Sequence, residues 1–262
     1  MKTRANGIEI NYEFHGREGA PWLVLSHSLA CSVRMWDPQI AALKDSYRIL
    51  ACDTRGHGAT EAPKGAYTLE LLADDLFFLL ENLNIDAAYY CGLSMGGMIG
   101  QTFALKYPGV FRTLTLADTT SRYPAEAGPL WAERIRTAEA KGMEPLAQPT
   151  LERWFTEPFR RKNAAAVDAI RKLILATPVA GYVGCSHAIP KINLTARLKE
   201  IRCPILVIVG ADDPGTPVSM AREIHENAPG SMLAVLPQAA HLANIEQPEG
   251  FTRALRDFLS SS

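Results

Sequence analysis

The chain has 262 residues, of which 47% are hydrophobic and 21% are charged, and it carries 27 basic and 28 acidic side chains. These proportions are ordinary for a globular protein and exclude a fibrous or disordered chain, while the net charge of -1 excludes a global field that would attract nucleic acid or an anionic membrane. A small-molecule partner is therefore favoured, and neither a nucleic-acid nor a membrane partner is expected.

Apolar runs and alternating patterns predict strands along the whole chain. In chain order they cover residues 7–14, 22–26, 47–53, 87–92, 112–117, 204–210 and 231–237. Helical periodicity predicts helices over residues 69–83, 95–107 and 248–259, and one more between the last two strands. The uncharged run 87–105 is nearly long enough to span a bilayer, but its glycines and polar residues indicate a buried strand, turn and helix instead.

Strands that alternate with helices and are almost continuously apolar are typical of a parallel sheet covered on both faces. Between residues 119 and 200, helical segments follow one another with no convincing strand. We therefore predict an α/β protein with a mostly parallel central sheet, in which residues 1–118 and 201–262 form the core. Residues 119–200 are predicted to be a helical cap inserted in that core.

The five cysteines indicate neither a disulfide framework nor a metal site. Their number is odd, and neither a Cys-x-x-Cys spacing nor a nearby pair of histidines suggests zinc. We expect reduced, mostly buried thiols, with Cys31 as a small apolar filler. The first seven residues are positively charged but no apolar stretch follows them, so the sequence predicts no secretory signal and a cytoplasmic location.

The strongest chemical signal is Gly92-Leu93-Ser94-Met95-Gly96, which lies between a predicted strand and a predicted helix. A serine at such a turn is held in a strained conformation, and glycines two residues to either side leave room for the close approach of the backbone. The start of the following helix adds free N–H groups that favour an anionic intermediate. This pattern predicts that Ser94 is a nucleophile.

A serine hydroxyl is a weak nucleophile near neutral pH, so it needs a general base. His241 is the best candidate, because it follows the last predicted strand in a loop that could reach Ser94. Solvated or packing roles are the default for three other histidines, His15, His187 and His225. His57 lies in the loop 53–58 after a strand, and this loop is expected to shape the rim of the site and not to hold the base.

The acid that orients the histidine is expected between the serine and the histidine in chain order. The loop Gly210-Ala211-Asp212-Asp213-Pro214 follows a predicted strand and leaves the same edge of the sheet as Ser94. Asp213 is preferred, because it stands three residues past the glycine that ends the strand; Asp212 could cap the turn instead. A carboxylate here would hold one tautomer of His241 and stabilise its charged form.

An oxyanion hole requires two backbone N–H groups aimed at the oxygen on which negative charge develops. One is expected from Met95, the residue after the nucleophile. The second is expected from Leu29, in the loop that leaves the strand 22–26. An ordinary turn at the end of a strand is the alternative for this loop.

At these residues the sequence resembles the 3-oxoadipate enol-lactonase branch of the α/β-hydrolases, over nearly the whole chain. The resemblance rests on residues 26–29, 35–36, 53–58, 61–65, 91–97 and 153–156. The most telling element is Trp154-Phe155-Thr156, with Arg153 before it. The resemblance implies the α/β-hydrolase fold, a triad of Ser94, Asp213 and His241, and an oxyanion hole at Leu29 and Met95.

The substrate of that family is an enol-lactone that bears a free carboxylate, so the resemblance implies a cation beside an aromatic wall. Trp131 and Arg134 are three residues apart and lie on one face of a predicted cap helix. Together with Trp154 they are our expected substrate contacts, against the alternative that the tryptophans are cap core and the arginine is solvated. No metal or cofactor is required for this chemistry.

Three alternatives stay open at this stage. His27 stands where these lactonases more often carry asparagine, so a carboxylesterase of different acyl specificity is one of them. A second is a perhydrolase or carbon–carbon hydrolase that uses the same triad. The third, from another class, is a binding protein that has kept the fold without turnover.

Overall fold

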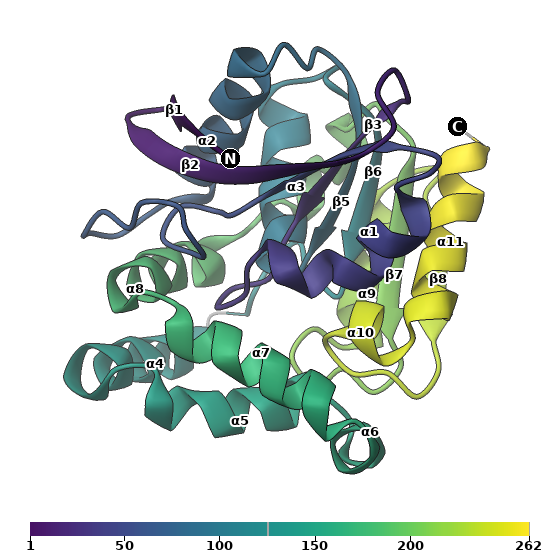
Figure 1. The fold of residues 1–262 in the computed structure, drawn as a ribbon. Coiled ribbons are helices and arrows are strands. Elements are labelled where there is room, and N and C mark those ends of the chain that lie inside the picture. The colour runs from purple at the N-terminus through teal and green to yellow at the C-terminus, as the bar shows by residue number, and fades with distance from the viewer. Residues whose placement is uncertain (125, 262) are drawn as a thin grey trace.

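The computed structural model describes residues 1–124 and 126–261, and its centre is an eight-stranded sheet of order β1-β2-β4-β3-β5-β6-β7-β8 (Figure 1). The strands are β1 (Lys2–Ala5), β2 (Ile8–Gly16), β3 (Trp22–Ser26), β4 (Arg48–Cys52), β5 (Ala88–Leu93), β6 (Phe111–Ala117), β7 (Ile205–Gly210) and β8 (Met232–Leu236). All neighbouring pairs among β3 to β8 are parallel, whereas β2 pairs antiparallel with β1 on one side and with β4 on the other. The predicted α/β class with a mostly parallel sheet is confirmed.

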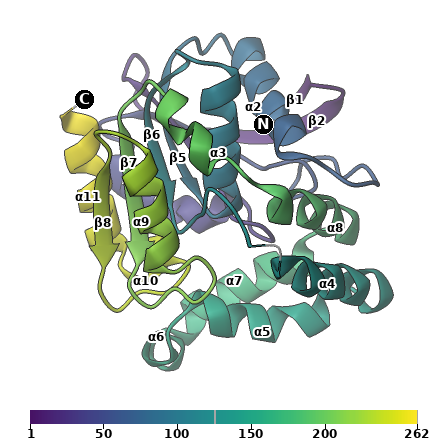
Figure 2. The ribbon, with the colours of Figure 1, turned by 180° about the vertical axis from the view of Figure 1, so that it is seen from behind.

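Helices cover both faces of this sheet. The opposite views in Figures 1 and 2 show α1 and α11 on one face and α2, α3 and α9 on the other. Their bounds are α1 (Asp37–Leu43), α2 (Leu69–Asn82), α3 (Met95–Lys106), α9 (Val218–Asn227) and α11 (Pro248–Ser260), with the short α10 (Ala243–Glu246) before α11. Because water is excluded from both faces, a central strand such as β7 is apolar and buried at every position.

A separate group of helices connects β6 to β7. It consists of α4 (Ala127–Lys141), α5 (Glu144–Trp154), α6 (Glu157–Lys162), α7 (Ala164–Ala176) and α8 (Val179–Ala188), and we call α4 to α8 the cap. Figure 1 shows the cap gathered beyond one end of the sheet, where the strand arrows point. An isolated β-bridge between Arg122 and Asn193 joins the chain segments that lead into and out of the cap.

Among the described helices, none by itself has the length and hydropathy to cross a membrane. The helix Ala164–Ala176 and the segment Val179–Lys191 meet that test only when they are taken together across a bend of 92°.

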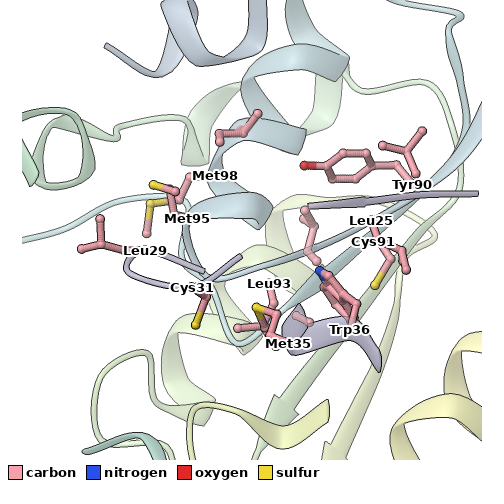
Figure 3. Packing of buried hydrophobic residues seen from close by; sticks show 14 of the residues in the cluster. Leu25, Leu29, Cys31, Met35, Trp36, Tyr90, Cys91, Leu93, Met95 and Met98 are labelled. Atoms are coloured by element: carbon pink, nitrogen blue, oxygen red, sulfur yellow. The ribbon is translucent and has the colours of Figure 1, made fainter. Parts of the chain in front are cut away.

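A continuous apolar layer lies beneath the carboxyl end of β5 (Figure 3). Leu25 of β3, Leu93 of β5 and Met95 of α3 are fully buried in it. The hydroxyl of Tyr90 donates a hydrogen bond to the carbonyl oxygen of Gly96 at 2.6 Å. The first turn of α3 is therefore fixed against two neighbouring strands, which gives the residue between β5 and α3 a rigid base.

Candidate active site

Ser94 occupies the single residue between the end of β5 and the start of α3. Its backbone angles are φ 56° and ψ -113°, a conformation that costs a residue with a side chain roughly 1–3 kcal/mol. Two hydrogen bonds hold it: Ser94 N donates to Ala117 O at 2.8 Å, and Thr119 Oγ1 donates to Ser94 O at 2.7 Å. The strain is thus sustained by the end of β6, the strand next to β5, and by Thr119 just after it.

The glycines around Ser94 are explained by close approach of the backbone. A Cβ on Gly96 would lie 2.3 Å from the carbonyl oxygen of Ser26, at the end of β3. A Cβ on Gly92 would lie 2.4 Å from the carbonyl carbon of Gly96. Only glycine lets α3 begin this close to both strands, as the sequence pattern predicts.

Three side chains form a continuous line of hydrogen-bonding contacts. His241 Nε2 lies 2.9 Å from Ser94 Oγ, and His241 Nδ1 lies 2.8 Å from Asp213 Oδ2. Since an ionised carboxylate can only accept, Nδ1 carries the proton and Nε2 is free to accept from the serine hydroxyl. The geometry is therefore that of a nucleophile, a general base and an orienting acid.

Asp213, and not its neighbour Asp212, makes this contact. Asp213 also accepts hydrogen bonds from Gly215 N, Thr216 N and Thr216 Oγ1, at 2.7, 3.1 and 2.7 Å. Burial opposes ionisation of Asp213, but the charge of His241 and the hydrogen bonds from His241 and Thr216 outweigh it, so its pKa lies below the usual range. Asp212 is exposed at the surface.

Two backbone N–H groups are available near Ser94. Among residues 1–124 and 126–261, the N–H groups of Leu29 and Met95 have no hydrogen-bond partner. Leu29 lines the same cavity as Ser94, and Met95 N–H is at the first residue of α3. Free backbone N–H groups of this kind are candidate donors to an oxyanion.

Two buried histidines support the loop that contains Leu29. His57 Nε2 accepts from Ala30 N at 3.0 Å, where Ala30 has a left-handed φ of 56°. His27 Nε2 accepts from Thr54 N at 2.9 Å. Burial, with the nearby charge of His27, lowers the pKa of His57 to about 3, so its ring is neutral and can accept. His57 is fully buried, and its ring supports the neighbouring loop from inside.

The cavity beside Ser94 has a volume of about 200 Å³, and the cap forms its opposite wall. All three residues predicted as substrate contacts line it: Trp131, Arg134 and Trp154. The guanidinium of Arg134 lies 4.8 Å from the ring centroid of Trp131, and the ring of Trp154 stacks on His241 with centroids 6.0 Å apart. The tryptophans are largely buried and also face the cavity.

Arg153 lines the same cavity and was not predicted as a contact, although it adjoins Trp154 in the sequence. It donates to Thr150 Oγ1 at 3.0 Å. Within the described part of the chain, neither Arg153 nor Arg134 has a carboxylate partner. Burial and the charge of Arg134 lower the pKa of Arg153, which indicates that the two guanidiniums repel each other. An anion in the cavity would relieve this repulsion.

No group of three or more histidine, cysteine, aspartate or glutamate side chains in the described residues has the arrangement to hold a metal ion. The contacts among Ser94, His241 and Asp213 are suited to proton transfer and nucleophilic attack by a serine.

The family model for the alpha/beta hydrolase fold matches residues 21–248. The chain belongs to the α/β-hydrolase family. Within this family it is 35% identical to 3-oxoadipate enol-lactonase 2 of Acinetobacter baylyi, over 96% of this chain and 93% of the relative. It is also 32% identical to a putative carbamate hydrolase, RutD, of Agrobacterium fabrum, over 95% of this chain and 98% of that protein.

Solved structures of α/β-hydrolases agree with this assignment. The enol-lactonase from Burkholderia xenovorans LB400 superposes with a TM-score of 0.96 at 36% identity, covering 99% of this chain and all of that one (100%). A thermophilic esterase from Thermogutta terrifontis with malate bound has a TM-score of 0.94 at 30% identity, with coverage of 100% and 98%. The resemblance to the enol-lactonases that the sequence motifs indicate is thus confirmed.

Proposed function

We propose that this α/β-hydrolase cleaves a small lactone or carboxylic ester through an acyl-enzyme, and that its substrate resembles that of the 3-oxoadipate enol-lactonases. The observation that carries the proposal is the contact of His241 with both Ser94 Oγ and Asp213 at a cavity that the cap closes. The relatives named as enol-lactonases, at 35% and 36% identity over almost their full length, support the lactone as substrate.

The reaction begins when Ser94 Oγ attacks the carbonyl carbon and His241 Nε2 takes the hydroxyl proton. Asp213 stabilises the charged histidine that results. The N–H groups of Leu29 and Met95 stabilise the negative oxygen of the tetrahedral intermediate. When the C–O bond breaks, His241 returns the proton to the leaving oxygen; in a lactone that oxygen stays tethered to the acyl group.

Water then hydrolyses the acyl-enzyme. His241 takes a proton from the water, and the hydroxide adds to the acyl carbon through a second oxyanion at the same donors. Collapse of this intermediate breaks the bond to Ser94 Oγ, which takes the proton back from His241. The product of a lactone is one ring-opened acid, and no metal or cofactor takes part in either half.

Arg134 and Arg153 supply the recognition of a substrate carboxylate in this proposal. Their lack of carboxylate partners in the described chain, their place in the cavity wall and their mutual repulsion all favour an anionic ligand. Trp131 and Trp154 would enclose the apolar part of the ring. The esterase of Thermogutta terrifontis, solved with the dicarboxylate malate bound, is in keeping with an acidic ligand in a related protein.

We also propose that residues 119–200 act as the cap of one folding unit formed by residues 1–118 and 201–262, in a cytoplasmic enzyme. A carboxylesterase of different acyl specificity is the second candidate, and the same esterase at 30% identity favours it. A binding protein without turnover is the alternative from another class.

The nucleophile is tested by turnover of p-nitrophenyl acetate. Wild-type protein is expected to release p-nitrophenol, and Ser94→Ala is expected to reduce the rate to background. Equal rates in the two proteins would refute the role of Ser94. No turnover of any ester or lactone by the wild type would favour the binding protein.

The substrate class is tested by comparing a carboxylated enol-lactone with a neutral ester. Arg134→Ala and Arg153→Ala should each raise KM for the lactone by about 10- to 100-fold, because each removes hydrogen bonds to a charged group. Neither change should alter KM for the neutral ester by a comparable factor. Arg136→Ala is the matched control, since Arg136 is on the same helix but is exposed and paired with Glu133. Equal losses on both substrates would refute the carboxylate contact.

A further inference from the structure

The two backbone N–H groups that flank His241 are both held by groups outside its own loop. Ala240 N donates to the Glu246 carboxylate at Oε2, at 2.5 Å. Leu242 N donates to the main-chain oxygen of Trp154, at 3.1 Å. The position of the His241 backbone therefore depends on a side chain of α10 and on the end of α5 in the cap.

The second oxygen of the same carboxylate is bound by the cap. Glu246 Oε1 accepts from Thr156 N at 2.9 Å and from Thr156 Oγ1 at 2.8 Å. One carboxylate thus bridges Thr156, just after α5, and Ala240, the residue before His241. We call Glu246, Thr156 and Ala240 the clasp.

Glu246 is buried, with 7% of its surface exposed, and it forms no ion pair with lysine or arginine in the described part of the chain. A buried carboxylate without a cation is costly, and here three charge-assisted hydrogen bonds offset part of the cost. Burial still outweighs these bonds, so the pKa of Glu246 lies above its usual value. All three partners are donors, so both oxygens have to accept. A glutamine of the same shape would place its NH₂ group against one of these donors.

The helix that carries Glu246 is itself fixed to the core. Asn244 Nδ2 donates to Met35 O at 2.9 Å, and Gln39 Nε2 donates to Asn244 O, also at 2.9 Å. Because α10 is anchored on that side, Glu246 can hold both Ala240 and Thr156 at defined positions. The ring of Trp154, two residues before Thr156, stacks on the ring of His241.

We propose that Glu246 is a positioning residue that, through the clasp, keeps His241 aligned between Ser94 and Asp213 while residues 154–156 of the cap are seated on its loop. The proposal rests on the proposed function, because it takes His241 as the general base. Glu246 would then affect kcat without contacting the substrate, through the position of His241. A shift of about 1 Å in a catalytic group can lower a rate by on the order of 100-fold.

The test uses kcat and KM for p-nitrophenyl acetate, a neutral ester that needs no contact with the arginines. Glu246→Gln and Glu246→Ala are expected to lower kcat by about 10- to 100-fold and to leave KM within about threefold of the wild type. Thr156→Val, which loses one donor, should lower kcat by about 3- to 10-fold, and Thr156→Ser, which keeps the hydroxyl, should restore it. The double variant Glu246→Ala/Thr156→Val should have the same kcat as Glu246→Ala alone, because the hydrogen bond that the valine removes is already lost.

Glu144→Gln is the matched control, because Glu144 is an exposed cap carboxylate that pairs with Arg171 and lies outside the clasp. Its kcat should stay within about twofold of the wild type. Thermal melts of every variant establish that it is folded. If Glu246→Ala does not fold, the isosteric Glu246→Gln variant alone tests the proposal.

Three results would overturn the inference: wild-type kcat in Glu246→Gln, equal kcat in Thr156→Val and Thr156→Ser, or full additivity in the double variant. Failure of the proposed function is a different result, in which the wild type itself turns over no ester or its rate is unchanged by Ser94→Ala.

Discussion

The loop around Asp213 gives this residue more hydrogen bonds than a surface carboxylate has. Besides His241, the donors come from Gly215 and Thr216, within three residues along the chain. These bonds favour the ionised form, which is the form that can hold the Nδ1 proton of His241 and leave Nε2 facing Ser94. The local fold of the loop thus fixes the tautomer of His241.

Asp213→Asn is expected to lower kcat for p-nitrophenyl acetate by on the order of 10⁴-fold, because an amide can hold the wrong tautomer of the histidine. Asp212→Asn is the control, since Asp212 is adjacent but exposed and does not contact His241. Steady-state kinetics of the two variants decide between the neighbours. A larger loss in the Asp212 variant would assign the role to Asp212.

The lowered pKa of Asp213 also predicts how stability depends on pH. A carboxyl group with a lower pKa in the folded than in the unfolded protein stabilises the fold above its unfolded pKa, which is about 3.9 for aspartate. This contribution is lost as the pH falls through the folded pKa. Urea unfolding should show a constant difference between wild type and Asp213→Asn above about pH 5, and a smaller one below about pH 4. A difference that grows on acidification would contradict the prediction.

At the scale of elements, the junction of β3, β5 and α3 has no spare volume. The carbonyl oxygen of Ser26 would lie 2.3 Å from a Cβ on Gly96, so one added methyl group has to separate α3 from β3. The same junction holds Ser94 and lies next to the two proposed oxyanion donors. The packing of α3 and the position of Ser94 therefore depend on the same close approach of the backbone.

Gly96→Ala is expected to lower the free energy of unfolding by about 1–3 kcal/mol or more, and to reduce kcat because Ser94 moves with the start of α3. Gly128→Ala is the matched control. Gly128 lies in α4 with nothing within 4 Å of the added Cβ, so the change should be neutral or slightly stabilising. Urea unfolding and ester turnover measure both effects, and an unaltered Gly96→Ala protein would contradict the packing argument.

Elements with a strong apolar pattern are the ones that the sequence predicts well. The strand 22–26 coincides with β3, and the helix predicted from residue 95 begins there. β1 (Lys2–Ala5) and α1 (Asp37–Leu43) were not predicted. β1 is a short edge strand with two basic residues, and α1 is only seven residues long with a proline at its start, so neither has a pattern long enough to stand out.

Some residues of the site can also be predicted from the sequence, and others cannot. Ser94 follows from a local motif, and His241 and Asp213 follow from chain order, because parallel strands bring their carboxyl ends to one edge. The second arginine of the cavity, Arg153, and the clasp at Glu246 did not follow. Their roles depend on how cap helices are seated against the core, which periodicity does not encode.

At the scale of the whole molecule, the chain returns to its sheet after the cap. β7 pairs with β6 and β8 pairs with β7, and both strands come from the last quarter of the chain. Without β7 and β8, β6 would become an edge strand of the sheet. Its buried apolar residues, such as Leu114 and Leu116, would then lie at an open edge that water can reach. The core is therefore complete only when both ends of the chain have assembled.

A fragment of residues 1–200 contains Ser94 and the whole cap, yet it is expected to aggregate or to lack fixed tertiary packing. Size-exclusion chromatography and near-ultraviolet circular dichroism, with the full chain as control, measure this. A soluble monomer with a cooperative unfolding transition would contradict the prediction that β7 and β8 are required.

The bridge between Arg122 and Asn193 brings the two ends of the inserted helices to neighbouring points on the core. Ser94, Asp213 and His241 lie outside that interval, whereas Arg134 and Arg153, which line the cavity, lie inside it. Replacing the helices between these two positions with those of a relative is therefore expected to change substrate selectivity and to leave the core intact. The replacement helices would need to supply hydrogen-bond donors to the Glu246 carboxylate in place of Thr156, and this requirement would decide which chimeric proteins are active.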